Sequence, residues 1–394
     1  MATLSPTTSE ALCAAIAEAA SKHARLEIRG GGSKADIGSP WGGAREVDIL
    51  DMRKFAGIVD YDPPELVLTV GAGTPLAEIE TLIAAKGQML AFEPWDHAPV
   101  FGRAPGAATI GGVIAAGVAG PQRLSMGGAR DHLLGFEAVS GRGEKFVAGA
   151  KVVKNVTGYD LPKLVAGSWG RLVALTQVTL KVLPRPRQQA TMIIENQTPQ
   201  QAHAAMAQAM GSHGEIAAAA YLPAAVNNGR AATLFRVQGF APSVDARCGF
   251  LPRLLKDHGD VLRLPDADAA RVWTAIRAVA PLAGSAALWR VNVPPSGGCA
   301  VVAALEPLGA RWFFDWAGGL VWLTFDGDAA LVRAAAEKAG GHAMLVRGPE
   351  GLRARVPGQH PRSKGVDALE ARVRRAFDPA GVFETTRFGD VHAN

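Results

Sequence analysis

The sequence Pro105-Gly-Ala-Ala-Thr-Ile-Gly-Gly-Val-Ile-Ala-Ala-Gly117 lies at the centre of a stretch, Gly102 to Gly128, that contains eight glycines. No charged side chain and no histidine occurs between Ala104 and Gln122. Glycine loses more conformational entropy on folding than other residues, so this density indicates positive φ angles or a close backbone approach to another group. A flexible linker would combine glycine with serine, whereas this stretch combines it with alanine, isoleucine and valine. Two interpretations stay open here. In the first, the backbone N–H groups of the stretch lie against a large, flat, partly phosphorylated ligand. In the second, the stretch is a packing seam or a bent strand.

The bulk composition is that of a soluble globular protein. The chain has 394 residues, of which 48% are hydrophobic and 20% charged, and this length is enough for two or three domains with separate cores. The net charge of +5 arises from 41 basic and 36 acidic side chains. Because this small surplus is dispersed along the sequence, the composition predicts no nucleic-acid binding.

Cysteine usage and the amino terminus predict a cytoplasmic protein. Cys13, Cys248 and Cys299 form no C-x-x-C pair, which argues against an iron–sulfur or zinc site in this chain and fits a reducing compartment. Glu10 and Glu18 interrupt the first apolar face, so no signal peptide is expected. No charge-free run is apolar enough to predict a transmembrane segment.

Hydrophobic periodicity and turn signals divide the first half into helices and strands. A helix is expected over Ser9–Ser21 with Ser9 as N-cap, and another after Pro75 with Thr74 as N-cap. The glycine turn Gly141-Arg-Gly143 predicts a hairpin. The expected strands are residues 25–29, 46–51, 66–70, 136–140, 145–148 and 170–182, and a short helix is expected within 158–166. Pro184-Arg-Pro186 predicts a domain boundary.

The second half predicts an antiparallel sheet with helices on one face, because strands and helices occur there in mixed order. The expected strands are residues 191–195, 216–222, 233–238, 288–293, 311–315, 320–324 and 343–347. The expected helices are residues 199–210, 244–256, 267–279, 329–338 and 367–377.

The run Gly30-Gly-Gly-Ser-Lys-Ala35 satisfies the G-x-G-x-x-A spacing of a dinucleotide-binding loop after a strand. In a Rossmann fold a helix begins at that loop and its N-terminus meets the pyrophosphate. The following Ile37-Gly-Ser-Pro-Trp-Gly-Gly43 cannot be helical, so the Rossmann interpretation fails. A glycine loop without a helix can still hold pyrophosphate through its N–H groups, with Ser33 and Lys34 as further donors. The chain has no Walker A pattern, so nucleotide hydrolysis is not expected.

Several motifs together resemble the FAD-binding domain of the vanillyl-alcohol-oxidase (PCMH) type over roughly the first half of the chain. They are Arg29-Gly-Gly-Gly-Ser-Lys34, Thr109-Ile-Gly-Gly112, Arg130-Asp131, Gly158-Tyr-Asp-Leu161 and Gly167-Ser-Trp-Gly170. Within that family, the whole chain resembles the small FAD-binding (E) subunits of bacterial glycolate oxidases. The residues that carry this are Lys154-Asn-Val-Thr-Gly-Tyr-Asp-Leu161, Leu180-Lys-Val-Leu-Pro-Arg-Pro186, Leu288-Trp-Arg290, Asp315-Trp-Ala-Gly-Gly319 and Phe377-Asp-Pro-Ala-Gly-Val-Phe383.

The resemblance implies an α+β fold in two domains. Residues 1–183 would form a PCMH-type FAD-binding domain. Residues 184–394 would form a smaller antiparallel α+β cap domain whose C-terminal helix returns to the flavin domain.

The resemblance also implies the FAD contacts. Two glycine loops would hold the pyrophosphate from two sides, and two later glycine motifs would line the adenosine and the flavin edge. The implied residues are Arg29, Gly30, Gly31, Gly32, Ser33, Lys34, Pro105, Gly106, Ala107, Thr109, Ile110, Gly111, Gly112, Gly158, Asp160, Leu161, Gly167 and Gly170. Some relatives carry a histidine bonded covalently to the flavin. Ser33 stands at that position, so non-covalent FAD is expected.

The sequence departs from the family pattern at three places. Relatives often read Gly-Thr-Leu-Gly where this chain has Gly170-Arg-Leu-Val173, and their usual ending Phe-Asn-Pro-Gly-Arg appears as Phe383-Glu-Thr-Thr-Arg387. The His-rich, metal-binding motif of the larger catalytic subunit has no counterpart. The nine histidines are scattered without metal-ligand spacing, so no metal site is expected.

Oxidation of a 2-hydroxy acid needs a cation for the carboxylate, a base for the hydroxyl proton and flavin N5 as hydride acceptor. Arg290 is the candidate for the carboxylate, because a planar guanidinium binds a carboxylate bidentately. The alternative for Arg290 is a structural strand arginine in a salt bridge. His97 and His360 are candidate bases, with a core or surface histidine as the alternative for each.

The resemblance implies a subunit of a glycolate oxidase complex that turns glycolate into glyoxylate and passes electrons onward. Its implied partners are a larger FAD-containing subunit and an iron–sulfur subunit, with peripheral membrane association through them. A stand-alone FAD-dependent alcohol or 2-hydroxy-acid oxidoreductase and a non-catalytic structural flavoprotein subunit are the alternatives.

Overall fold

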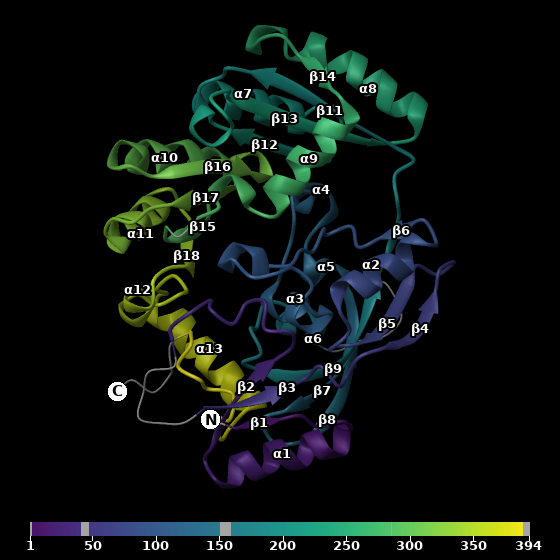
Figure 1. Ribbon diagram of the computed structural model, residues 1–394, viewed down its shortest axis with the longest axis vertical. Helices are drawn as coiled ribbons and strands as arrows, with labels where there is room; N and C mark the ends of the chain where they lie inside the picture. The colour runs from purple at the N-terminus through teal and green to yellow at the C-terminus, as the bar shows by residue number, and fades with distance from the viewer. Residues whose placement is uncertain (1, 41–46, 150–158, 285, 389–394) are drawn as a thin grey trace. The chain divides into compact units, whose positions relative to one another are not determined.

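The computed structural model describes residues 2–40, 47–149, 159–284 and 286–388 (Figure 1). The chain forms two compact units. Unit 1 comprises Met1–Ala119, Gly127–Pro184 and Pro361–Asn394, and unit 2 comprises Gly120–Met126 and Arg185–His360. The last helix, α13 (Lys364–Phe377), therefore belongs to unit 1 together with the first half of the chain. No helix in the described part of the chain is long and apolar enough to cross a membrane.

Unit 1 contains one parallel and one larger antiparallel sheet. The parallel sheet has the order β1 (Thr3–Leu4), β3 (Val47–Asp51), β2 (Arg25–Arg29). The antiparallel sheet has the order β4 (Ile58–Asp62), β5 (Val67–Gly71), β9 (Val173–Lys181), β7 (Leu133–Ser140), β8 (Lys145–Gly149). A short ladder joins β6 (Gln88–Met89) to β10 (Leu183–Pro184). The predicted hairpin is present, since β7 and β8 pair antiparallel.

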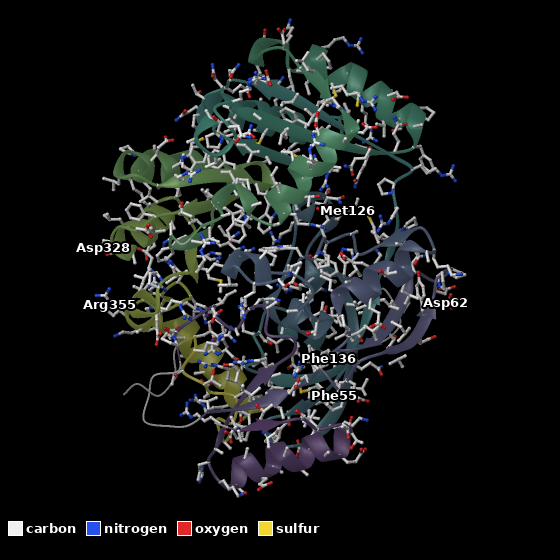
Figure 2. All side chains as sticks on the ribbon, in the orientation of Figure 1. Phe55, Asp62, Met126, Phe136, Asp328 and Arg355 are labelled. Carbon is white, nitrogen blue, oxygen red and sulfur yellow. The ribbon has the colours of Figure 1, made fainter. Side chains whose placement is uncertain are left out.

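Helix α1 (Ser9–Ser21) packs on the parallel sheet of unit 1. Its buried residues Leu12, Ile16 and Ala19 contact a cluster that includes Leu50 and Phe383. On the antiparallel sheet, Phe136 of β7, labelled in Figure 2, packs edge-on against Phe146 of β8, with ring centroids 5.7 Å apart. The apolar face that helical spacing predicts for α1 is therefore the face that is buried in the folded protein.

Both predicted N-caps of unit 1 are wrong by one residue. The hydroxyl of Thr8, not that of Ser9, accepts the N–H of Ala11. Helix α2 (Leu76–Ala84) begins after Pro75, and the Thr74 hydroxyl donates instead to the carbonyl of Gly71 at 2.7 Å. Thr74 is fully buried, so its hydroxyl stabilises the turn that follows β5.

The glycine-rich stretch contains a short helix, α3 (Ile110–Ala116), rather than a bent strand. Gly117 ends this helix with a left-handed φ of 63°. A β-carbon on Gly111 would lie 2.8 Å from the carbonyl oxygen of Ala72. Gly111 thus provides the close helix-to-strand approach that the packing-seam interpretation predicts. The remaining short helices are α4 (Arg123–Met126) in unit 2, and α5 (Ala129–His132) and α6 (Leu161–Val165) in unit 1.

Unit 2 is built on one antiparallel sheet of eight strands, which confirms the predicted antiparallel sheet. Its order is β14 (Leu262–Leu264), β11 (Gln188–Glu195), β13 (Ala232–Gly239), β12 (Ala218–Leu222), β16 (Arg311–Asp315), β17 (Leu320–Thr324), β15 (Leu288–Asn292), β18 (His342–Arg347). Its helices are α7 (Pro199–Met210), α8 (Ala241–Leu254), α9 (Asp266–Arg277), α10 (Gly298–Leu305), α11 (Ala329–Lys338) and α12 (Glu350–Arg355).

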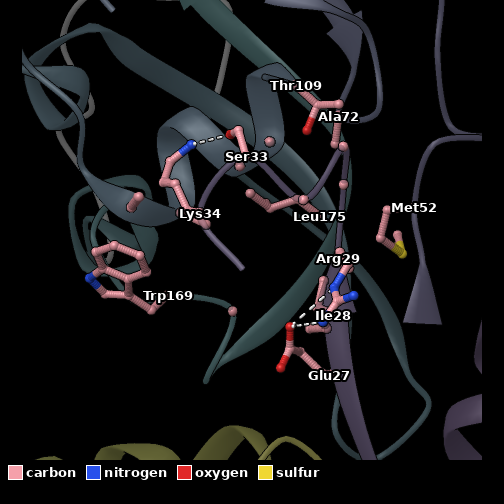
Figure 3. A pocket seen from close by; sticks show the side chains of 18 of the residues that line it. Glu27, Ile28, Arg29, Ser33, Lys34, Met52, Ala72, Thr109, Trp169 and Leu175 are labelled. Carbon is pink, nitrogen blue, oxygen red and sulfur yellow. Dashed lines mark hydrogen bonds and ion pairs between the residues drawn. The ribbon is translucent and has the colours of Figure 1, made fainter. Parts of the chain in front are cut away.

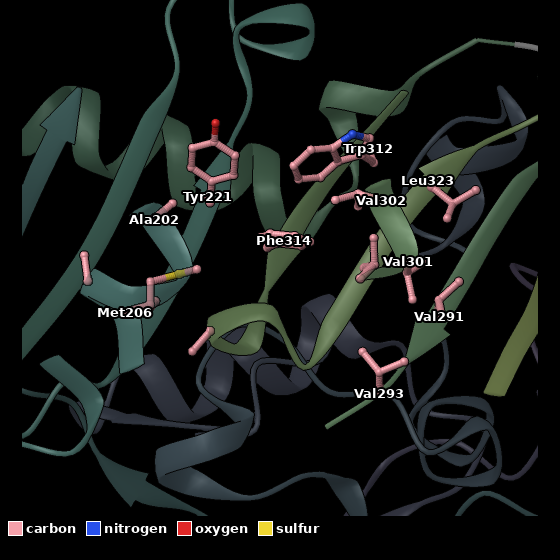
Figure 4. Packing of buried hydrophobic residues seen from close by; sticks show 14 of the residues in the cluster. Ala202, Met206, Tyr221, Val291, Val293, Val301, Val302, Trp312, Phe314 and Leu323 are labelled. Carbon is pink, nitrogen blue, oxygen red and sulfur yellow. The ribbon is translucent and has the colours of Figure 1, made fainter. Parts of the chain in front are cut away.

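The main core of unit 2 lies between one face of this sheet and the helices α7, α8, α10 and α11. Figure 4 shows Met206 of α7 and Val301 of α10 over a row of aromatic strand residues that includes Tyr221, Trp312 and Phe314. The buried Tyr221 hydroxyl donates to the carbonyl of Gln197 at 2.7 Å. The one polar atom of this side chain is therefore hydrogen-bonded, as expected of a buried polar group.

Helix α9 lies on the opposite face of the sheet, so the prediction that all helices share one face is wrong. Its Trp273 donates from Nε1 to the Thr191 hydroxyl at 3.0 Å, and the Arg236 guanidinium stacks 4.7 Å from the Trp273 ring centroid. Thr191 alternates with the core residues Ala190 and Met192 of β11, and alternate strand residues point to opposite faces.

Candidate functional site

A pocket of about 740 Å³, part of it open to solvent, lies within unit 1 (Figure 3). Strand β2, the glycine loop after it, helix α3 and strand β9 provide most of its walls. Its lining residues are Glu27, Ile28, Arg29, Gly30, Gly31, Gly32, Ser33, Lys34, Ala35, Met52, Ala72, Thr109, Gly111, Gly112, Ala115, Ala116, Trp169, Gly170, Val173, Leu175 and Arg387.

The glycine loop can approach the start of α3 because it has no side chains there. A β-carbon on Gly30 would lie 2.1 Å from Oγ1 of Thr109, and one on Gly31 would lie 1.7 Å from the carbonyl oxygen of Ala107. Gly32 has a φ of 75°, a conformation that favours glycine. Any larger residue at Gly30 or Gly31 would push the two loops apart and change the pocket between them.

Lys34 is a buried cation at one end of the pocket. Its side chain is almost entirely buried, and Nζ donates to the Ser33 hydroxyl at 3.2 Å. Burial lowers the pKa of Lys34 to about 8; the Asp96 carboxylate opposes this shift and the nearby Arg387 adds to it. A phosphate anion beside Nζ would raise this pKa again, because an opposite charge favours the charged form.

Glu27 and Arg29 lie at the other end of the pocket lining, with Leu175 between them and the Lys34–Ser33 pair (Figure 3). Oε1 of Glu27 accepts hydrogen bonds from Nη2 of Arg29 at 2.9 Å and from Nε at 3.2 Å. Oε2 of Glu27 is buried and has no hydrogen-bond partner among the described residues. This oxygen is therefore an acceptor in need of a donor, such as a ribose hydroxyl or an adenine amino group.

Arg387, near the carboxyl end, anchors the glycine loop from behind. Its guanidinium donates to the carbonyls of Ile37 and Lys34 and lies 3.5 Å from Oε1 of Glu27. The departure Phe383-Glu-Thr-Thr-Arg387 from the usual family ending thus keeps an arginine in the pocket wall. Sequence reasoning did not find this residue, because nothing local to it points to a ligand.

Ten of the predicted cofactor residues line the pocket together. They are Arg29, Gly30, Gly31, Gly32, Ser33, Lys34, Thr109, Gly111, Gly112 and Gly170. Seven others lie outside its lining: Pro105, Gly106, Ala107, Ile110, Asp160, Leu161 and Gly167. Gly158 lies outside the described residues.

The residues outside the lining have structural contacts instead. The N–H groups of Gly106 and Ala107 donate to Oδ2 of Asp96 at 2.7 and 3.0 Å. Asp160 caps α6, whose first residue is Leu161, by accepting the N–H of Lys163. Ile110 is fully buried, and the N–H of Gly167 donates to the carbonyl of Ile114 at 3.0 Å. These contacts shape the loops around the pocket without lining it.

The pocket also has apolar walls that the motif search did not select. They are Ile28, Met52, Ala72, Ala115, Ala116, Val173 and Leu175, and they lie in the lining together with Trp169 of the quoted Gly167-Ser-Trp-Gly170 motif. Val173 and Leu175 are alternate residues of β9 and therefore point to the same face of the strand. This alternation was the signal in the sequence that could have identified them as residues of one wall. Apolar walls, glycine-loop N–H groups and the buried Lys34 together suit a ligand with flat rings and a pyrophosphate, and the pocket therefore fits FAD.

The candidate catalytic residues lie apart from this lining. Arg290 is on β15 in unit 2, 5.3 Å from the Trp316 ring centroid. Among the described residues its guanidinium makes no hydrogen bond or ion pair, although the opposite charge of Asp315 lies nearby, and its role stays a prediction. His97 is buried and stacks on Trp95 with ring centroids 3.6 Å apart.

His360 also has structural partners. Its Nδ1 accepts the N–H of Ala343 at 3.2 Å, and its Nε2 lies 3.1 Å from a Glu337 oxygen. Its role as a base stays a prediction. No group of three or more His, Cys, Asp or Glu side chains is positioned to hold a metal ion in the part of the chain that the structure describes.

Comparison with known families and structures places this geometry among flavoproteins. The profile of the family described as FAD binding domain matches residues 1–149. A solved structure of alkyldihydroxyacetonephosphate synthase superposes with a TM-score of 0.66 at 15% identity, covering 96% of this chain and 75% of that chain. At this identity the likeness shows the fold alone, which is the predicted PCMH-type fold.

The sequence relatives are oxidoreductases. D-lactate dehydrogenase of Archaeoglobus fulgidus is 31% identical over 48% of this chain and 40% of its own length. Glycolate oxidase subunit GlcD of Bacillus subtilis is 30% identical over 37% of this chain and 29% of its own length. Glycolate oxidase subunit GlcE of Escherichia coli is 34% identical over 96% of this chain and 97% of its own length.

The other two matches cover less than half of this chain, whereas the similarity to GlcE covers 96% of it and so extends over both units. With a pocket that fits FAD in unit 1 and this similarity along nearly the whole chain, the protein belongs to the GlcE family and is an FAD-binding oxidoreductase subunit.

Proposed function

We propose that this chain is the smaller FAD-binding subunit of a complex that oxidises glycolate to glyoxylate. The observation that carries the proposal is the 34% identity to glycolate oxidase subunit GlcE over 96% of the chain. The pocket of unit 1 supports it, because its glycine loop and buried lysine suit a dinucleotide cofactor.

Residues of both units have parts in this proposal. The N–H groups of Gly30 to Gly32 and Nζ of Lys34 would hold the pyrophosphate of FAD, and Met52 and Leu175 would contact its flat rings. Bound FAD supplies the hydride acceptor for the oxidation of an alcohol. Arg290 would bind the carboxylate of the acid, because its planar guanidinium makes no hydrogen bond or ion pair among the described residues.

The proposal assigns proton abstraction to a partner. His97 is stacked on Trp95, and His360 is bonded to a backbone N–H and lies beside Glu337. A positioned base contributes about 10²–10⁴-fold to rate, so a chain without one is nearly silent alone. A larger FAD-containing subunit similar to GlcD would supply the base, and an iron–sulfur subunit would receive the electrons. We place the complex in the cytoplasm, with peripheral membrane association through these partners.

The test is anaerobic addition of glycolate or D-lactate to the FAD-loaded chain, alone and with the larger subunit, while flavin absorbance is followed. We expect slow or no bleaching alone and rapid bleaching of the complex. Prompt bleaching of the isolated chain, abolished by Arg290→Ala, would instead make it a stand-alone oxidoreductase. To resolve the two flavins of the complex, this chain is loaded with 5-deazaFAD. Full activity with 5-deazaFAD in this chain would make it a non-catalytic structural subunit.

A further inference from the structure

Two arginines of unit 2 surround one tryptophan ring. The guanidinium carbon of Arg123, the first residue of α4, lies 4.6 Å from the Trp316 ring centroid. The guanidinium carbon of Arg290, on β15, lies 5.3 Å from the same centroid. Both distances are within the range of a cation–π contact, about 6 Å, so a single indole brings two positive charges close together.

Trp316 is held in place by one hydrogen bond from its ring and one from its backbone. Its Nε1 donates to the carbonyl of Gly120 at 3.0 Å, and its backbone N–H donates to Oδ1 of Asp315 at 2.8 Å. Trp316 and Ala317 both have left-handed φ angles, 51° and 52°. Non-glycine residues rarely adopt this strained conformation, which is typical of binding and active sites.

The two positive charges are only partly balanced by negative charge. Among the described residues, neither the Arg123 nor the Arg290 guanidinium makes a hydrogen bond or an ion pair. Burial and, to a smaller extent, the positive charge of Arg123 lower the pKa of Arg290 to about 10, and Asp315 opposes this shift only in part. An anion between the two guanidiniums would remove this repulsion.

We propose that Arg123, Trp316 and Arg290 form a binding site for the carboxylate of a small organic acid. Two planar guanidiniums match the two oxygens of a carboxylate, and a guanidinium binds that group bidentately. The indole face gives the short carbon chain of the acid an apolar surface to contact. That the acid is the glycolate of the reaction rests on the proposed function; that unit 2 binds a small carboxylate does not.

The experiment compares glycolate with glycolamide, its neutral analogue, by isothermal titration of the FAD-loaded chain. The variants are Arg123→Gln and Arg290→Gln. Arg187→Gln is the matched control, because Arg187 also stacks on an aromatic ring of unit 2, 5.5 Å from the centroid of the exposed Phe240. We expect glycolate but not glycolamide to bind the wild-type chain and the control. Each of the two site variants should bind glycolate about tenfold or more weakly, since a hydrogen bond to a charged group is lost.

A second measurement separates binding from folding. Without any acid, Arg123→Gln should melt at or above the wild-type temperature, because it relieves the repulsion of two like charges. With glycolate, the wild-type chain should gain melting temperature and Arg123→Gln should not. Arg123 is exposed, so this variant tests the site even where Arg290→Gln fails to fold.

Three results would overturn the site: equal binding of glycolate and glycolamide, wild-type affinity in both site variants, or inorganic phosphate bound as tightly as glycolate. Failure of the proposed function gives a different pattern. If these arginines bind glycolate but the complex never reduces its flavin, the result supports the carboxylate site and contradicts the proposed function. If the complex with Arg123→Gln is reduced by glycolate with the wild-type KM, the result supports the proposed function and contradicts the carboxylate site.

Discussion

Arg387 donates a hydrogen bond from Nε to the carbonyl oxygen of Ile37, 350 positions earlier in the chain, at 2.6 Å. The same guanidinium donates to the carbonyl of Lys34, and its side chain is 9% exposed. The segment after helix α13 thus holds the glycine loop from behind, at the far end of the sequence from the residues that it positions.

Arg387→Ala should lower both the stability of unit 1 and its affinity for FAD. A hydrogen bond to a charged group contributes about 1.5–3 kcal/mol, and unpaired buried carbonyls add to the loss. The measurements are urea unfolding of the apoprotein and fluorescence titration with FAD. Arg372→Ala, on the exposed part of α13, is the control and should leave both unchanged. Wild-type FAD affinity in Arg387→Ala would show that the loop keeps its shape without this anchor.

Gly111→Val and Gly112→Val should have different effects. A β-carbon on Gly111 would lie 2.8 Å from the Ala72 carbonyl oxygen, so valine there should destabilise the apoprotein by about 1–3 kcal/mol through overpacking. A β-carbon on Gly112 meets only Thr109 Oγ1 at 3.4 Å and Lys34 Nζ at 4.0 Å. Valine at Gly112 should therefore fold but fill pocket space and weaken FAD binding. Thermal melting of the apoprotein and FAD titration of each variant measure the two effects. Unchanged flavin affinity in Gly112→Val would make α3 a packing element only.

FAD should be released when the purified yellow protein is denatured. Ser33 stands at the position where some relatives carry a covalently bonded histidine, and it lines the pocket with its hydroxyl bonded to Lys34. A serine hydroxyl is not expected to form that bond. Acid precipitation should leave the flavin in the supernatant. Flavin that stays with the precipitate, or a folded colourless chain that FAD cannot reconstitute, would contradict this prediction.

Lys34 should make FAD binding depend on pH in the alkaline range. Its pKa in the folded chain is lowered to about 8 from 10.5, so the charged form that favours pyrophosphate is lost as pH rises through about 8. FAD affinity should fall there. The unfolded chain binds the extra proton between about 8 and 10.5, so the apoprotein should gain stability from this group as pH rises through that window.

Lys34→Met removes both pH effects in this prediction. Titrations with FAD at pH 7 and pH 9.5, and urea unfolding of the apoprotein at the same two values, measure them. The wild-type chain should show opposite trends for affinity and stability, and the variant should show neither. If the FAD affinity of the wild-type chain does not change from pH 7 to 9.5, the charge on Nζ of Lys34 does not contribute to binding of the pyrophosphate.

Much of the local structure could be predicted from the sequence. Helix α7 and strands β2, β16 and β17 have the expected bounds, because period, caps and turns act over a few neighbouring residues. Strand β4 has no such signal: its residues are mostly exposed, and only pairing with β5 makes it a strand. Helix α9 was expected, but its face of the sheet depends on Trp273 and Thr191, which are 82 positions apart.

The sequence by itself determined the glycine loop, the flavin-binding family and the division into local elements, because glycine and apolar spacing act through local backbone sterics and burial. Only the tertiary structure decided which glycines face the pocket and which pack, that Arg387 anchors Lys34, and that Arg123 and Arg290 share the Trp316 ring. Those relationships join residues far apart in the chain, and no local pattern records them. They depend on how sheets and helices pack, which sets the distances between side chains that the sequence keeps separate.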